Sequence, residues 1–130
     1  MIEFLRGRRI LVVEDEFLLA DDLQSALERA GAEVLGPSSS VRQALAILRA
    51  EGDPDGAVLD VNLAGDRVWP VALALRERGV PFVFATGYDA PSIDPEFSAV
   101  PRLVKPVEAE DIVARLFGPE EPPGDGGRRS

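Results

Sequence analysis

Apolar residues in this chain follow two alternating patterns, which together predict a regular succession of strands and helices. Short, nearly continuous apolar runs bounded by turn residues are typical of strands buried on both faces of a parallel sheet. We predict such strands at 9–13, 32–35, 57–61, 82–86 and 102–104. Between them, apolar residues recur every three or four positions, which predicts helices at 19–30, 41–51, 67–78 and 108–117.

Residues that commonly begin and end helices support these limits. Ser40 and Gln43 have the spacing of a capping box before the second helix. Gly31 and Gly52 follow the first and second helices, where glycine commonly ends a helix. Pro70 is compatible with the third helix because it falls in the first turn.

The segment 87–100 breaks the pattern, because Pro91 and Pro95 leave little room for a regular helix. We therefore expect an irregular or shortened fourth helix where the chain joins the fourth and fifth strands. Strands that alternate with helices form a parallel sheet with right-handed crossovers and helices on both faces. For five strands, the usual doubly wound, flavodoxin-like α/β solution has the order 2-1-3-4-5, with its switch point between strands one and three.

Length and composition indicate one folded unit. With 130 residues, 45% of them hydrophobic and 28% charged, the chain can form a single domain with a proper core. We expect a short lead at 1–7 and a domain at 8–117. A disordered tail is expected at 118–130, where seven of the thirteen residues are glycine or proline.

The charge balance and the missing residue types argue against several functions. The chain has no cysteine and no histidine, which excludes disulfides, thiolate metal sites and histidine-based catalysis. Its net charge of −9, from 14 basic and 23 acidic residues, argues against direct nucleic-acid binding. No apolar run is long enough for a membrane helix and no signal-peptide pattern begins the chain. We therefore expect a cytoplasmic protein with no membrane partner.

Residues that carry chemistry stand at the ends of four predicted strands. Glu14 and Asp15 follow the first strand, Asp60 lies near the end of the third, Thr86 ends the fourth, and Lys105 follows the fifth. Open α/β sheets place their functional sites outside the carboxyl ends of the strands. Carboxylates without histidine or cysteine favour Mg²⁺ as the bound metal. A nucleophilic acid, a metal, a hydroxyl and an ammonium group are the parts that phosphoryl transfer needs.

Each of these residues also has a purely structural explanation. Asp60 is suited to turning the chain at a strand end, and Glu14 and Asp15 suit the start of a helix. Thr86 is an ordinary β-branched strand residue, and Lys105 is of a type that usually lies in solvent. Only their joint arrangement favours a functional site over these explanations.

The same strand ends carry motifs that resemble the receiver domain of bacterial two-component response regulators. The motifs are, in chain order, VVEDE at 12–16, VLDVN at 58–62, ATG at 85–87 and VKP at 104–106. The resemblance covers about residues 8–117. It implies that Asp60 accepts a phosphoryl group from a phosphohistidine on a partner histidine kinase or phosphotransfer protein.

The resemblance also implies a magnesium site. Asp15, Asp60 and the backbone carbonyl of Asn62 would ligate Mg²⁺ directly, and Glu14 would reach the metal mainly through water. Glu14 departs from the Asp that is commoner in the family at this position.

Two further residues receive roles from the resemblance. Thr86 would form a hydrogen bond to the phosphoryl group and move with it, and Lys105 would form an ion pair with it. The Lys105–Pro106 peptide bond would be cis. The implied chemistry is self-phosphorylation at Asp60 followed by autodephosphorylation. We therefore expect a signalling protein and not an enzyme that turns over an external substrate.

The chain departs from the ordinary receiver in its fourth and fifth strands. Most receivers have an aromatic residue three positions before the lysine, where this chain has Arg102. The sequence at 84–88, FATGY, resembles the FATGUY subgroup, which suggests a partner kinase of the HWE type. We hypothesise that phosphorylation orders or shifts residues 87–100, with Thr86, Tyr88 and Arg102 as the switch residues.

We expect a stand-alone response regulator, a monomer or weak homodimer, that signals by protein–protein contact or acts as a phosphate sink. One alternative is a pseudo-receiver that binds proteins without being phosphorylated, against which the intact Asp60, Thr86 and Lys105 argue. Another is an Mg²⁺-dependent phosphohydrolase, which commonly needs an acid two residues after its nucleophile, where this chain has Asn62. A flavin-binding protein is least favoured, because the acids after the first strand would repel a phosphate.

Overall fold

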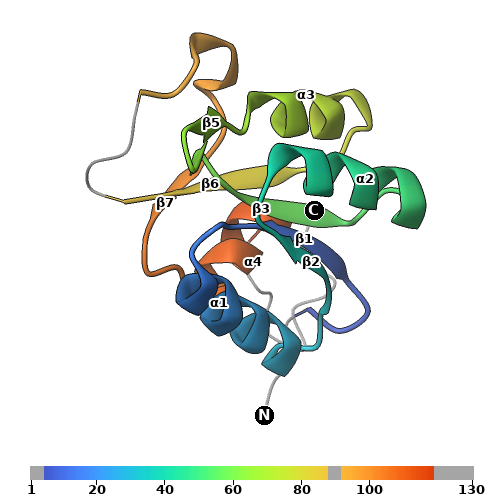
Figure 1. The fold of residues 1–130 in the computed structure, drawn as a ribbon. Helices are drawn as coiled ribbons and strands as arrows, with labels where there is room; N and C mark the ends of the chain where they lie inside the picture. Colours follow the sequence, from blue (N-terminus) through green and yellow to red (C-terminus); the bar gives the residue numbers. More distant parts are fainter. Residues whose placement is uncertain (1–4, 88–91, 119–130) are drawn as a thin grey trace.

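The computed structural model describes residues 5–87 and 92–118, and its centre is a five-stranded parallel sheet (Figure 1). The strands are β1 (Arg9–Val13), β2 (Glu33–Ser38), β3 (Gly56–Asp60), β6 (Phe82–Thr86) and β7 (Arg102–Val104). Their order is β2-β1-β3-β6-β7, and all four pairings are parallel. This is the predicted order, so the doubly wound, flavodoxin-like α/β fold is confirmed.

Helices cover both faces of the sheet. They are α1 (Phe17–Arg29), α2 (Val41–Glu51), α3 (Trp69–Glu77) and α4 (Ala109–Phe117). α2 and α3 lie on one face, and α1 and α4 lie on the other (Figure 1). Strand side chains alternate between the two layers: Leu11 and Leu59 belong to the core under α2 and α3, and Ile10 and Val58 to the core under α1 and α4. Each central strand is therefore buried on both faces, as its continuous apolar sequence predicts.

Several helix and strand limits differ from the predictions by one to three residues, and two of these differences have a clear local reason. α1 begins at Phe17, two residues before its predicted start. The apolar pattern did not reveal these residues because Phe17 and Leu18 are exposed and do not extend the buried stripe of the helix. β2 continues to Ser38, beyond its predicted end, because its pairing with β1 resumes at Val13 after a register shift. The predicted cap of α2 is confirmed, since Ser40 Oγ accepts the N–H of Gln43 at 3.1 Å.

A small hairpin follows β3 where the sequence pattern predicts only a loop and a helix start. Its strands are β4 (Asn62–Leu63) and β5 (Asp66–Arg67), which pair antiparallel. The turn residues Ala64 and Gly65 have φ values of 53° and 99°. Positive φ at both central residues is typical of a two-residue type I′ hairpin loop. Because β5 takes up Arg67, α3 begins at Trp69, two residues later than predicted.

The connection from β6 to β7 contains no α-helix among its described residues, 87 and 92–101, which confirms the predicted shortened fourth helix. Within the described part of this connection, the one regular element is the 3₁₀ turn η1 (Pro95–Phe97). Asp94 Oδ1 caps this turn by accepting the N–H of Glu96 at 2.9 Å. Tyr88 lies outside the described residues, so the expectation for it stays untested.

An aromatic cluster attaches this connection to the body of the domain. Phe97 is buried and stacks on Trp69, with ring centroids 5.6 Å apart. It also makes edge contacts with Phe84 and Phe82, at centroid distances of 6.2 Å and 6.3 Å. The guanidinium carbon of Arg76 lies 4.8 Å from the centre of the Phe97 ring. Residues 95–97 are thus held against α3 and β6 by one buried side chain.

The part of the lead that the structure describes contributes to the core. Leu5 is fully buried, and its N–H donates to the carbonyl of Ala30 at 2.7 Å. Residues 119–130, which make up nearly all of the predicted tail, lie outside the described residues. Within the described chain, no helix has both the length and the apolar character to cross a membrane.

We expect Phe97→Ala to lower the free energy of unfolding by about 3–4 kcal/mol, because it empties a buried aromatic site. Phe17→Ala is the matched control: Phe17 is 79% exposed, and its loss should cost less than about 0.5 kcal/mol. Denaturant unfolding followed by circular dichroism measures both. An equal loss of unfolding free energy in the two variants would show that Phe97 does not anchor the connection from β6 to β7.

Candidate functional site

The candidate site forms where four parallel strands end at one edge of the sheet. The strands end at about the same level, as the cross-strand pairs Val13–Leu59, Asp60–Ala85 and Thr86–Val104 show. Glu14 and Asp15 follow β1, Asp60 ends the neighbouring strand β3, Thr86 ends β6, and Lys105 follows β7. The topology therefore brings all five predicted residues to the same edge.

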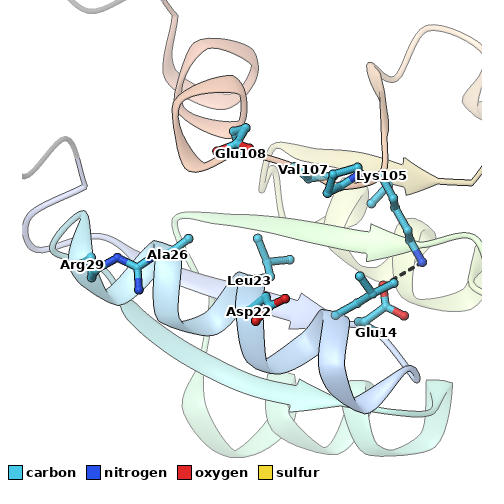
Figure 2. A pocket seen from close by; sticks show the side chains of 11 residues that line it. Glu14, Asp22, Leu23, Ala26, Arg29, Lys105, Val107 and Glu108 are labelled. Atoms are coloured by element: carbon cyan, nitrogen blue, oxygen red, sulfur yellow. Dashed lines mark ion pairs between the residues drawn. The ribbon is translucent and has the colours of Figure 1, made fainter.

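Lys105 joins two of the acids directly. Its Nζ lies 2.8 Å from Glu14 Oε1 and 3.0 Å from Asp60 Oδ2. The side chains of Lys105, Glu14 and Asp60 are 18%, 5% and 11% exposed. Figure 2 shows Lys105 reaching from the end of β7 to Glu14. Ion pairs this far from solvent are screened much less than surface pairs, so the ammonium strongly offsets the charge of the acids.

The three acids are close enough to share one cation. Glu14, Asp15 and Asp60 each offer a carboxylate oxygen, and these oxygens lie within 4.8 Å of one another. Backbone groups orient two of them: the N–H of Glu16 donates to Glu14 Oε2 at 3.0 Å, and the N–H of Asn62 donates to Asp60 Oδ1 at 3.2 Å. Carboxylates at this spacing repel one another unless a cation lies between them. An all-oxygen donor set of this kind fits Mg²⁺.

Burial and neighbouring charges change the pKa values of the central pair. Burial raises the pKa of Asp60 above its ordinary value, and the charge of Glu14 adds to the increase, although hydrogen bonds from Lys105 and the Asn62 N–H oppose it. Burial acts to lower the pKa of Lys105, but hydrogen bonds to Glu14 and Asp60 outweigh it and leave that pKa raised. Lys105 therefore stays charged, and the Asp60 carboxylate is more basic than an exposed aspartate.

The other predicted residues lie at different places around this centre. Thr86 is buried at the end of β6, and its carbonyl accepts the N–H of Lys105 at 2.8 Å. The Lys105–Pro106 peptide bond is cis, as expected. Arg102 is exposed at the start of β7 and not at the carboxyl edge. Tyr88 is not among the described residues.

Arg67 contacts a predicted site residue, and sequence reasoning did not identify it. Its Nη1 donates to Asn62 Oδ1 at 2.8 Å, across the β4–β5 hairpin. Exposed residues at 62 and 67 alternate with buried ones at 63 and 68, and Gly65 lies between the two halves. That pattern around a glycine is the hairpin signal that could have revealed the pair.

A groove of about 240 Å³ extends from the site between α1 and the connection from β7 to α4 (Figure 2). Glu14 and Lys105 contribute to its lining, and Leu23 of α1 lies across it from Val107. The site is therefore continuous with an accessible, partly apolar surface.

No protein-family model matches the chain, but curated relatives do. The sensory transduction protein LytT of Bacillus cereus is 36% identical over 112 residues, which are 83% of this chain and 45% of LytT. The positive alginate biosynthesis regulatory protein of Pseudomonas aeruginosa is 34% identical over 111 residues, 82% of this chain and 45% of that protein. The chain thus spans about half the length of the curated relatives it matches.

Solved structures give likenesses that extend over most of both chains. SdrG from Sphingomonas melonis Fr1 is 42% identical, with 89% of this chain and 96% of SdrG covered and a TM-score of 0.73. The BeF3-activated conformation of SdrG from Pseudomonas melonis Fr1 is 45% identical, with 82% and 89% covered and a TM-score of 0.66. A response regulator receiver protein from Sinorhizobium medicae WSM419 is 27% identical, with 86% and 93% covered and a TM-score of 0.69. The chain therefore belongs to the receiver domains of two-component response regulators, as shown by these likenesses together with the acids at the strand ends and the lysine that joins them.

Proposed function

We propose that the chain is a phospho-accepting response regulator whose acceptor is Asp60. The donor is a phosphohistidine on a partner histidine kinase or phosphotransfer protein, and the transfer requires Mg²⁺. The observation that carries this proposal is the Lys105 ammonium, 3.0 Å from Asp60 and 2.8 Å from Glu14 within a cluster of three acids. A carboxylate nucleophile beside a fixed positive charge and a cation-binding cluster is suited to receiving a phosphoryl group.

The chain's own residues have separate parts in the transfer step. A carboxylate oxygen of Asp60 bonds to phosphorus while the phosphorus–nitrogen bond of the donor breaks, and the imidazole nitrogen keeps the bonding pair. The raised pKa of Asp60 favours this attack. Lys105 offsets the charge of the phosphoryl oxygens, and the Thr86 hydroxyl donates a hydrogen bond to one of them. Mg²⁺ held by the three acids and the backbone carbonyl of Asn62 would neutralise the remaining charge.

A relative supports the same chemistry. SdrG, which is 45% identical to this chain, has a BeF3-activated conformation. Beryllofluoride has the shape and charge of a phosphoryl group bound to a carboxylate. We infer that Asp60 of this chain takes the corresponding adduct.

We propose that the kinase docks over α1. The first two residues of this helix, Phe17 and Leu18, are 79% and 73% exposed. The partly apolar groove along α1 leads to Lys105. Exposed apolar residues at the start of α1, together with this groove farther along the helix, suit a partner helix that carries the phosphohistidine above an apolar face. The FATGUY-like sequence at 84–88 is the reason for proposing a kinase of the HWE type.

We propose that the chain acts as a stand-alone regulator, through protein–protein contact or as a phosphate sink. It hydrolyses its own phosphoaspartate and turns over no external substrate. A net charge of −9 favours a protein partner over nucleic acid.

The aromatic cluster offers a route by which phosphorylation could change the surface. Thr86 lies two residues after Phe84 on β6, and Phe84 contacts both Trp69 and Phe97. Phe84 is also paired in register with Arg102 of β7. We propose that a shift of Thr86 toward the phosphoryl group is transmitted through Phe84 to residues 92–100 and to Arg102.

Incubation with Mg²⁺ and acetyl phosphate should add one phosphoryl group, because burial raises the pKa of the Asp60 carboxylate and a fixed ammonium lies beside it. Asp60→Asn should abolish the gain, which intact mass spectrometry measures. Asp53→Asn is the matched control, since Asp53 is exposed and pairs with Arg78 before β3, at the opposite edge of the sheet. Phosphorylation of Asp60→Asn would refute the assignment of the acceptor, and a chain that takes neither a phosphoryl group nor beryllofluoride would be a pseudo-receiver.

Mg²⁺ should raise the thermal unfolding temperature, because it relieves the repulsion among the three acids. At 100 times the dissociation constant, the stabilisation is about 2.7 kcal/mol. Asp15→Asn should lose most of the shift, and Asp53→Asn should keep it. Calorimetric scans with Mg²⁺ and with a chelator give the comparison, and an undiminished shift in Asp15→Asn would place the metal elsewhere.

Beryllofluoride with Mg²⁺ should change the fluorescence of Trp69, the single tryptophan of the chain, because Trp69 stacks on Phe97. Asp60→Asn should show no change under the same conditions. If mass spectrometry shows the wild-type adduct while the emission stays constant, the aromatic cluster does not transmit the switch.

A further inference from the structure

The β4–β5 hairpin holds Arg67 against Asn62, and neither the metal site nor the proposed transfer step uses this contact. The two residues are directly paired across the hairpin, and Arg67 Nη1 donates to Asn62 Oδ1 at 2.8 Å. A guanidinium group only donates hydrogen bonds, so it must face the oxygen of the carboxamide and not its nitrogen. The contact therefore fixes the orientation of the Asn62 side chain.

The hairpin itself is anchored in the core. Leu63 and Val68 are buried in the layer under α2 and α3, and the N–H of Val68 donates to the carbonyl of Val61 at 3.0 Å. Asn62 and Arg67 immediately precede these two buried residues and are both exposed. A cross-strand pair on a short, anchored hairpin is thus held by the backbone as well as by its own hydrogen bond.

Asn62 is also in contact with the proposed phosphoryl acceptor. Its backbone N–H donates to Asp60 Oδ1 at 3.2 Å. The side chain of Asp60 is only 11% exposed, whereas Asn62 is exposed. Asn62 is therefore an exposed residue whose backbone contacts the nearly buried acceptor, which makes it a neighbour of water that reaches Asp60 from solvent.

We propose that Arg67 is a positioning residue that prolongs the lifetime of phosphorylated Asp60 by occupying the carboxamide oxygen of Asn62. This inference rests on the proposed function. In hydrolysis, a water oxygen bonds to phosphorus while the bond between phosphorus and the Asp60 oxygen breaks. The carboxylate keeps the bonding pair, and the proton released by the water passes to the phosphate or to solvent.

The orientation of the attacking water is the step on which Arg67 acts. Carboxamide side chains orient attacking water in phosphoryl transfer, and an oxygen that accepts a hydrogen bond from the water serves this purpose. In this chain Arg67 takes one of the two acceptor positions of that oxygen and fixes the direction of the other. Loss of the guanidinium frees the oxygen for water and speeds hydrolysis, without altering the residues that receive the phosphoryl group.

The test is the decay of the phosphorylated full chain. The protein is loaded with acetyl phosphate and Mg²⁺, the donor is removed, and the phosphorylated fraction is followed by intact mass. Arg67→Ala should shorten the half-life about three- to tenfold, which is the effect of one hydrogen bond, with an unchanged loading rate. Arg67→Lys should stay within about twofold of wild type, because lysine also donates. Arg49→Ala, at an exposed position on α2, is the matched control.

A double variant separates positioning from a general effect of charge. In an Asn62→Ala background, Arg67→Ala should change the half-life no further. Thermal unfolding confirms that each variant is folded, and Arg67→Met, which keeps side-chain length without the donor, replaces Arg67→Ala if that variant does not fold. The inference is overturned, and the proposed function is not, if Arg67→Ala leaves the half-life unchanged or if it changes the half-life equally in the wild-type and Asn62→Ala backgrounds. A wild-type chain that takes no phosphoryl group overturns the proposed function, and this inference with it.

Discussion

The ammonium of Lys105 is the interaction on which the rest of the site depends. Glu14, Asp15 and Asp60 gather their carboxylates within 4.8 Å, in a place where two of the three are buried. Such a cluster is unfavourable without positive charge, and Lys105 supplies it through two short contacts. The same contacts raise the pKa of Lys105 and partly offset the increase that burial causes in the pKa of Asp60. The pair therefore stays charged although it is largely removed from solvent. A carboxylate kept ionised yet poorly solvated is a stronger nucleophile than one in water.

The order of the strands is what allows this contact. Lys105 follows the edge strand β7, whereas its partners belong to β3 and β1, so its side chain must pass the end of β6. The residue of β6 that pairs with Asp60 is Ala85, whose side chain is a single methyl group. Ala85 and Lys105 line the same groove. A large residue at this position would separate the lysine from the acids, and the fold would then exist without the site.

Much of the fold and of the central site follows from local sequence, and what could not be predicted depends on tertiary contacts. Continuous apolar strands that alternate with helices indicate a doubly wound parallel sheet and its usual strand order. The positions of the acids and Lys105 could be predicted because strand ends are easy to locate. The hairpin is marked only weakly: Gly65 and the alternation around it indicate a turn, but Ala64 has a φ of 53°, a conformation that its residue type gives no reason to expect. The pairing of Arg67 with Asn62 depends on that turn. The packing of Phe97 on Trp69 joins residues 28 positions apart, and no local pattern encodes it.

The two features that the sequence hid lie on separate structural units beside the site. The hairpin follows β3 and touches Asp60 through the backbone of Asn62, whereas the aromatic cluster connects α3, β6 and η1. The first unit borders the place where water would attack, and the second borders the surface that would change on phosphorylation. The polar pair and the aromatic cluster share no residue, although Leu63 and Val68 of the hairpin region pack in the same core layer as Phe84 and Phe97. Under the proposed function, the lifetime of the phosphorylated state and the change that it produces would therefore depend on different side chains within one domain.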